Sequence, residues 1–97
     1  MDPLPKNIKQ SRVVVYSKDP CPSCVSAKNL LLRKGVSFEV IDTTHNPAME
    51  EEMIRRASPR KTYPQIFIDD QGVGGYADLK KLDEEERLED LLFPRGR

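Results

Sequence analysis

The sequence contains no tryptophan and very little cysteine: Cys21 and Cys24 are the only thiols among 97 residues. A structural zinc site needs four ligands. Only one histidine, His45, is available to add to the two cysteines, which is too few for such a site within one chain. We therefore expect no metal site, and we expect His45 to lie in a surface turn.

Long apolar runs and net charge are also absent. There is no stretch of 18 apolar residues, and the first ten residues lack the apolar segment of a signal peptide. Sixteen basic residues balance sixteen acidic ones, whereas nucleic acids and anionic membranes are normally bound by a basic face. We therefore expect a soluble, cytoplasmic, monomeric protein with neither of those partners, built as one small domain.

The two cysteines are close in sequence, as Cys21-Pro22-Ser23-Cys24. Residues three apart on a helix share one face, so their sulfurs can reach disulfide distance. Proline is favoured at the first helical position, which makes Cys21 the N-cap, facing the free N–H groups of Ser23 and Cys24 and the positive end of the helix dipole. Both effects stabilise a thiolate. We therefore predict that Cys21 is a nucleophile and that Cys24, less exposed, is the resolving thiol. By itself the motif indicates either a redox pair or half of a metal site.

The rest of the chain predicts alternating strands and helices in one domain, residues 12–93, between a flexible arm of residues 1–11 and a tail of residues 94–97. The run from Val13 to Tyr16 is typical of a central strand covered on both faces, with Tyr16 in the core. The first strand, helix and strand imply a right-handed parallel unit, and a later turn implies an antiparallel hairpin. The predicted elements are a strand from Arg12 to Ser17, a helix from Pro22 to Lys34 ended by Gly35, an alternating strand from Val36 to Asp42, a helix from Pro47 to Ala57, a strand from Pro64 to Asp69, a short strand at Val73-Gly74, and two consecutive helices between Gly75 and Leu92, the second capped by Asp83.

Three motifs in this order resemble the glutaredoxin family of the thioredoxin fold. They are Tyr16-Ser17-Lys18 before the cysteine motif, the segment from Thr62 to Ile68, and the segment from Gly74 to Leu79. The resemblance covers about Val13 to Leu92. It implies an α/β, thioredoxin-like fold: a four-stranded mixed sheet in the order β-α-β-α-β-β-α, with helices on both faces.

The resemblance also implies a groove for glutathione. In the family, the proline at Pro64 is cis and lies beside the nucleophile, and the backbone of the preceding residue, here Tyr63, pairs with the cysteinyl part of glutathione. Glutaredoxins usually have valine where this chain has Tyr63, and most often tyrosine where it has Ser23. Lys18 and Gln65 match positions that attract the glycyl carboxylate, with Arg60 or Lys61 adding positive charge. The γ-glutamyl end would bind at the helix start. The glutathione-binding residues implied are Lys18, Tyr63, Pro64, Gln65, Gly75, Ala77 and Asp78.

The function implied is that of a dithiol glutaredoxin, a thiol-disulfide oxidoreductase. It would reduce glutathione mixed disulfides and protein disulfides through Cys21 and Cys24, with glutathione as cosubstrate and no permanently bound cofactor. Its partners would be glutathione and oxidised or glutathionylated client proteins. Three alternatives remain open at this point: a redoxin that is reduced by thioredoxin reductase and serves ribonucleotide reductase, a carrier of a [2Fe–2S] cluster held by Cys21 and glutathione, and a non-catalytic binding module. Lys18, Gln65 and Asp78 weigh against the first, and Pro22 weighs against the second.

Overall fold

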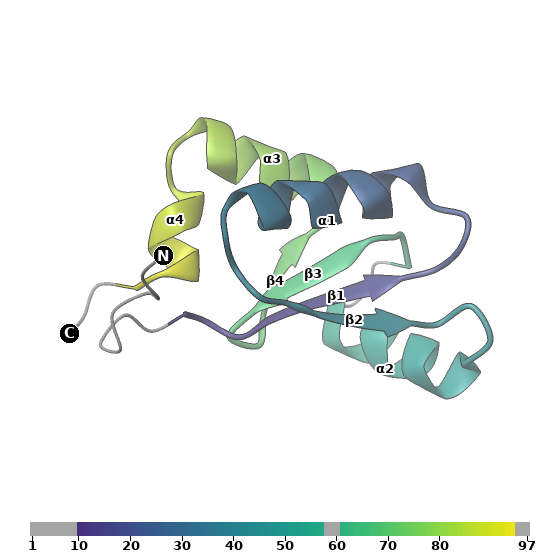
Figure 1. The fold of residues 1–97 in the computed structure, drawn as a ribbon. Coiled ribbons are helices and arrows are strands. Elements are labelled where there is room, and N and C mark those ends of the chain that lie inside the picture. The colour runs from purple at the N-terminus through teal and green to yellow at the C-terminus, as the bar shows by residue number, and fades with distance from the viewer. Residues whose placement is uncertain (1–9, 58–60, 95–97) are drawn as a thin grey trace.

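The computed structural model describes residues 10–57 and 61–94, and within them four strands and four helices form a layered α/β unit (Figure 1). Their order is β1 (Val13–Ser17), α1 (Pro22–Arg33), β2 (Glu39–Asp42), α2 (Pro47–Ala57), β3 (Gln65–Ile68), β4 (Gln71–Gly74), α3 (Tyr76–Glu84) and α4 (Leu88–Leu92). The predicted succession of elements is confirmed.

The sheet is mixed, with strand order β2-β1-β3-β4. β1 runs parallel to β2, with Val15 opposite Val40, and antiparallel to β3, with Val15 opposite Ile66. β3 and β4 form the predicted antiparallel hairpin. All five residues of β1 are buried, because a strand with neighbours on both edges and helices on both faces has no side facing water.

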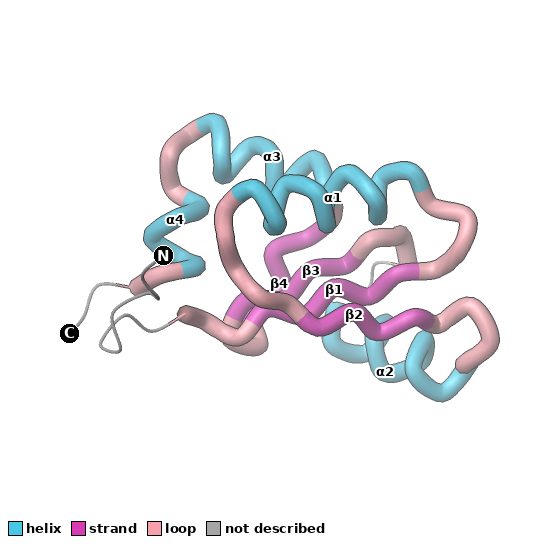
Figure 2. Tube along the Cα trace, viewed as in Figure 1, coloured by secondary structure: helices cyan, strands magenta, loops and turns pink. Residues whose placement is uncertain are grey.

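Helices cover both faces of the sheet: α1 and α3 lie on one face and α2 on the other (Figure 2). On the first face the core joins Val13 and Val15 to Ala27, Leu31 and Leu79. On the second face it joins Val14, Tyr16, Met53 and Phe67. The alternation of β1 side chains between the two faces explains how one short strand supplies both cores.

Two predicted details are wrong. The second strand begins at Glu39 rather than Val36, and Val40 is 41% exposed, because β2 is an edge strand with a neighbour on one side only. Asp83 is not an N-cap. It belongs to the last turn of α3, where its carboxylate pairs with Lys34 Nζ at 2.5 Å, and α4 starts only at Leu88. Asp83 is therefore a helical residue of α3 that pairs with the cation following α1.

The described chain begins with residues that are held firmly. Ser11 is buried; its N–H donates to the Leu92 carbonyl at 2.8 Å and its hydroxyl to the Leu91 carbonyl at 2.6 Å. The Gln10 side chain exchanges hydrogen bonds with the backbone of Ser37. The predicted flexible arm therefore does not include Gln10 and Ser11. Residues 1–9 and 95–97, which make up the rest of the predicted arm and most of the predicted tail, lie outside the described residues.

In the part of the chain that the structure describes, no helix has the length and apolar character needed to cross a bilayer.

Candidate active site

Cys21 caps the first helix as its spacing predicts. Its backbone is extended, with φ −153° and ψ 91°, and its Sγ accepts a hydrogen bond from the Cys24 N–H at 3.1 Å. Cys21 and Cys24 form a disulfide with their Cα atoms 5.2 Å apart. Cys24 is 1% exposed, whereas Cys21 remains partly exposed. The sulfur that a substrate can reach is therefore the one that receives a helical N–H.

The predicted cis bond between Tyr63 and Pro64 is present, and a second cis bond, which the sequence did not indicate, joins Asp19 to Pro20. Pro64 is buried and directly precedes β3. Its carbonyl oxygen lies against Gly75: a Cβ placed on that glycine would stand 3.4 Å from it. The start of α3 therefore lies directly beside the proline turn.

The N-terminus of α3 is capped by the side chain of Asp78, a residue of the same helix. Asp78 Oδ2 accepts a hydrogen bond from the Gly75 N–H at 2.9 Å, which is half of a capping box, because Gly75 has no side chain that could accept the Asp78 N–H in return. Ala77, between them in sequence, is exposed. Gly75, Ala77 and Asp78 are therefore brought together at one helix end, where carboxylates are favoured by the dipole.

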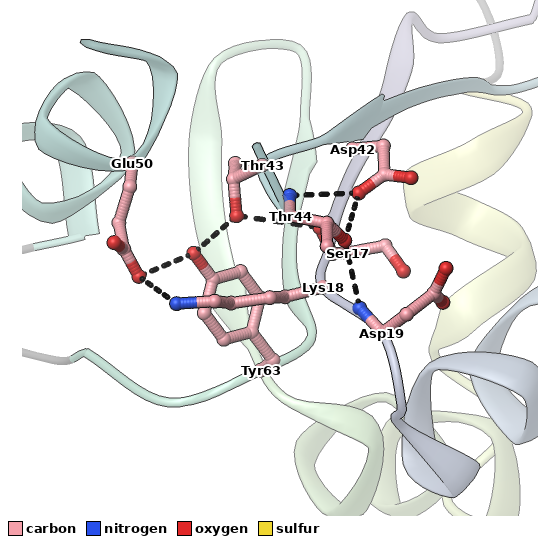
Figure 3. A network of polar contacts seen from close by, with 8 residues as sticks. All are labelled: Ser17, Lys18, Asp19, Asp42, Thr43, Thr44, Glu50 and Tyr63. Atoms are coloured by element: carbon pink, nitrogen blue, oxygen red, sulfur yellow. Dashed lines mark hydrogen bonds and ion pairs between the residues drawn. The ribbon is translucent and has the colours of Figure 1, made fainter. Parts of the chain in front are cut away.

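Lys18 is paired with a residue that the sequence analysis did not identify. Its Nζ donates to Glu50 Oε2 at 3.3 Å and lies 5.9 Å from the centre of the Tyr63 ring. The Tyr63 hydroxyl donates to the same Glu50 oxygen at 2.8 Å and is 2.6 Å from Thr43 Oγ1. Figure 3 shows these side chains, from four different segments, converging on Glu50 and Tyr63. Glu50 comes from α2, and no signal near Lys18 in the sequence indicates it.

This arrangement shifts the pKa values of Glu50 and Tyr63. The Tyr63 hydroxyl, and after it the Lys18 ammonium, hold the pKa of the Glu50 carboxyl below its ordinary 4.5. Burial, and then the Glu50 carboxylate, raise the pKa of the Tyr63 hydroxyl above its ordinary 10.0, although the hydrogen bond with Thr43 acts in the opposite direction. At neutral pH the Glu50 side chain is therefore a carboxylate and the Tyr63 side chain a neutral phenol.

Comparison with known proteins identifies the family. The family model for glutaredoxin matches residues 13–73, a span that includes Lys18, both cysteines, Glu50 and the Tyr63-Pro64 turn. The chain belongs to the glutaredoxin family. It is a dithiol glutaredoxin, a glutathione-dependent thiol-disulfide oxidoreductase, with the thioredoxin-like fold that the three motifs imply.

Three proteins illustrate the similarity. Glutaredoxin 3 of Escherichia coli K12 is 50% identical over 82 residues, which are 84% of this chain and 98% of that protein. The solution structure of glutaredoxin from Brucella melitensis is 42% identical with a TM-score of 0.77, covering 91% of this chain and 95% of its own. A buckwheat glutaredoxin-glutathione complex shares the fold at 22% identity, with a TM-score of 0.77 and coverage of 84% and 76%.

The sequence predicts that Gln65 binds the glycyl carboxylate of glutathione, which requires an accessible side chain. In this glutaredoxin the Gln65 side chain is buried instead. The side chain is 2% exposed, and its Nε2 donates to the Thr62 carbonyl oxygen at 2.8 Å and to Thr62 Oγ1 at 3.0 Å. The amide therefore holds the loop that leads to Tyr63-Pro64.

Lys61 is exposed in the same loop, and Arg60 lies outside the described residues. His45 is exposed and Tyr16 is fully buried, as predicted.

Proposed function

We propose that Cys21 is the nucleophile and Cys24 the resolving thiol in the reduction of both glutathione mixed disulfides and protein disulfides. The observation that carries this assignment is the difference between the two sulfurs: Cys21 Sγ is partly exposed and accepts the Cys24 N–H at 3.1 Å, while Cys24 is buried. A helical N–H stabilises a thiolate, and a buried thiol reacts more readily with a sulfur already bonded to its neighbour than with a free substrate.

The two reactions share their first bond. With a glutathionylated client, the Cys21 thiolate attacks the glutathione sulfur, the client leaves as a thiolate, and a second glutathione then removes the first as glutathione disulfide. With a protein disulfide, Cys21 forms a mixed disulfide with the client. The Cys24 thiolate breaks that bond, which releases the reduced client and leaves the Cys21–Cys24 disulfide. Two glutathione molecules reduce this disulfide.

Glutathione is proposed to bind along a line from Lys18 to the start of α3. The Tyr63 backbone pairs with its cysteinyl residue beside Pro64, in the manner of an added strand. The N–H groups at the start of α3 receive the γ-glutamyl carboxylate, while Lys18 faces the glycyl carboxylate. Gln65 contributes to this end of the site by holding the loop at Thr62. The contact between Gly75 and the Pro64 carbonyl supports this proposal, and so does the glutathione complex of a buckwheat protein with the same fold. The residues proposed are Lys18, Tyr63, Pro64, Gln65, Gly75, Ala77 and Asp78.

We also propose that the protein acts as a monomer in a reducing, cytoplasmic compartment. One chain supplies both thiols and all the glutathione-binding residues named above, so the reaction needs no second subunit. Glutathione must be largely reduced to recharge the pair. Client proteins, rather than nucleic acids or membranes, are the expected macromolecular partners of a chain with no net charge.

The assignment of roles is tested by replacing each cysteine with serine. Cys24→Ser is expected to keep the removal of glutathione from a glutathionylated peptide and to lose the reduction of a protein disulfide. Cys21→Ser is expected to lose both reactions. The assays are a glutathione-coupled deglutathionylation and the reduction of insulin disulfides. Equal loss of both reactions in Cys24→Ser would contradict the roles given to the two thiols.

A further inference from the structure

Glu50 brings a carboxylate of the protein itself to the lysine proposed to bind glutathione. Lys18 follows β1, Tyr63 precedes β3, and Glu50 lies near the start of α2 (Figure 3). One oxygen of Glu50 serves both neighbours, accepting from Lys18 Nζ at 3.3 Å and from the Tyr63 hydroxyl at 2.8 Å. The lysine therefore already has a carboxylate partner before a substrate arrives.

The ion pair is open to exchange. The side chains of Lys18 and Glu50 are 41% and 29% exposed, so a carboxylate from solvent can approach the ammonium. That ammonium has three donors, but two carboxylates gathered on one cation repel each other. An incoming carboxylate must either displace Glu50 or bind beside it at reduced strength. The Tyr63 hydroxyl holds Glu50 in the competing position.

We propose that Glu50 is an internal competitor for the glycyl carboxylate of glutathione at Lys18, and that it lowers the affinity of the site for glutathione relative to uncharged ligands. Glu50 is thus a specificity-determining residue that acts through Lys18, and Tyr63 positions it through its hydroxyl. This inference rests on the proposed role of Lys18 in glutathione binding.

The test compares two ligands that differ only in the glycyl carboxylate: glutathione and its glycyl monoethyl ester. In the Cys24→Ser background the mixed disulfide on Cys21 is not resolved. Glutathione ester then exchanges with bound glutathione: one Cys21–sulfur bond breaks, another forms, and the proton of the ester thiol passes to the released glutathione. The ratio of the two adducts at equilibrium, at low ionic strength, is read by intact-protein mass spectrometry. Both adducts belong to the same protein sample, so differences in protein concentration between variants do not change their ratio.

Glu50→Gln is expected to shift this ratio towards glutathione by about two- to fivefold, the range of an exposed ion pair. Tyr63→Phe keeps the ring and removes the hydroxyl, so it is expected to shift the ratio in the same direction by less. The matched control is Glu51→Gln, which makes the same change of charge at the next, exposed position of α2. It is expected to leave the ratio unchanged.

Lys18→Met separates this inference from the proposed function. It is expected to shift the ratio away from glutathione and to abolish the effect of Glu50→Gln. If Lys18→Met changes nothing, the proposed binding role of Lys18 is wrong, and the inference fails with it. If Lys18→Met acts as expected while Glu50→Gln behaves like Glu51→Gln, or if the Glu50→Gln shift persists without Lys18, the inference alone is overturned.

Discussion

Asp42 organises the turn between β2 and α2. Its Oδ1 accepts the Thr44 N–H at 2.9 Å and the Thr44 hydroxyl at 2.5 Å, while Thr44 Oγ1 accepts the Asp19 N–H at 3.0 Å (Figure 3). The turn is thereby linked to the loop that leads to the cysteines. The Thr44 hydroxyl, and after it the Thr44 N–H, hold the pKa of the Asp42 carboxyl below its ordinary 3.8.

The lowered pKa of Asp42 predicts a pH-dependent contribution to stability. A carboxyl with a lower pKa in the folded state stabilises the fold above its unfolded value, and this stabilisation is lost as the pH falls through the folded value. Asp42→Asn is therefore expected to lower the free energy of unfolding at neutral pH. The difference from wild type should shrink below about pH 3.8. Urea unfolding from neutral pH to about pH 2 measures it. Asp90→Asn, an equal change of charge at an exposed position of α4, is the control. A difference independent of pH would contradict the prediction.

At the scale of elements, helix α1 is defined at both ends by local chemistry. Cys21 caps its start, and Gly35 follows its last turn with φ +77°, donating its N–H to the Leu32 carbonyl at 3.0 Å. This left-handed conformation is one that residues with a side chain avoid. The helix therefore stops at a definite residue, which sets the position of β2 relative to β1.

Gly35→Ala tests the stop of α1. No atom lies within 4 Å of the Cβ that alanine would add, so the expected cost comes from the backbone conformation alone and is about 1 kcal/mol in the free energy of unfolding. Gly35→Asn is the matched control and is expected to cost less, because asparagine tolerates this conformation better. Urea unfolding compares the two variants. Equal stability of the alanine variant and wild type would show that the helix end is not restricted in this way.

At the scale of the whole molecule, α4 lies at the end of the fold opposite the start of α1 (Figure 1). Leu88 and Leu92 are fully buried in the core between the sheet and α1. The carbonyls of Leu91 and Leu92 hold Ser11 through the two hydrogen bonds described above. The two ends of the described chain thus stabilise each other.

Leu92→Ala measures how much the packing of α4 contributes to the free energy of unfolding. Removal of a fully buried leucine is expected to lower the free energy of unfolding by about 2–5 kcal/mol. Leu91, its neighbour, is 39% exposed, so Leu91→Ala is expected to change stability by at most about 0.5 kcal/mol while leaving the backbone bonds to Ser11 in place. Thermal and urea unfolding give both values. Similar losses in the two variants would show that α4 does not anchor the core.

Most of the fold was predictable because its signals are local. Val13 to Tyr16 is apolar throughout and forms a fully buried inner strand, and Asn46-Pro47 starts α2, with Asn46 Oδ1 accepting the Met49 N–H. Predictions failed where the local structure depends on a residue or strand that is distant in sequence. The acidic run after Leu82 is typical of a first helical turn, but Asp83 lies in the last turn of α3 and pairs with Lys34, which follows α1. The alternation from Val36 to Val40 does not reveal that β2 has one neighbouring strand only.

The sequence by itself determined the reactive centre of this glutaredoxin. Capping depends on residues within one helical turn, so Cys21, Pro22 and Cys24 were sufficient to predict which sulfur receives the helical N–H and which is buried. The surroundings of Lys18 were decided by the tertiary structure alone. Glu50 lies 32 residues away in sequence, and only the packing of α2 against the sheet brings its carboxylate to that lysine. An ion pair depends on distance in space, and the sequence does not contain that distance.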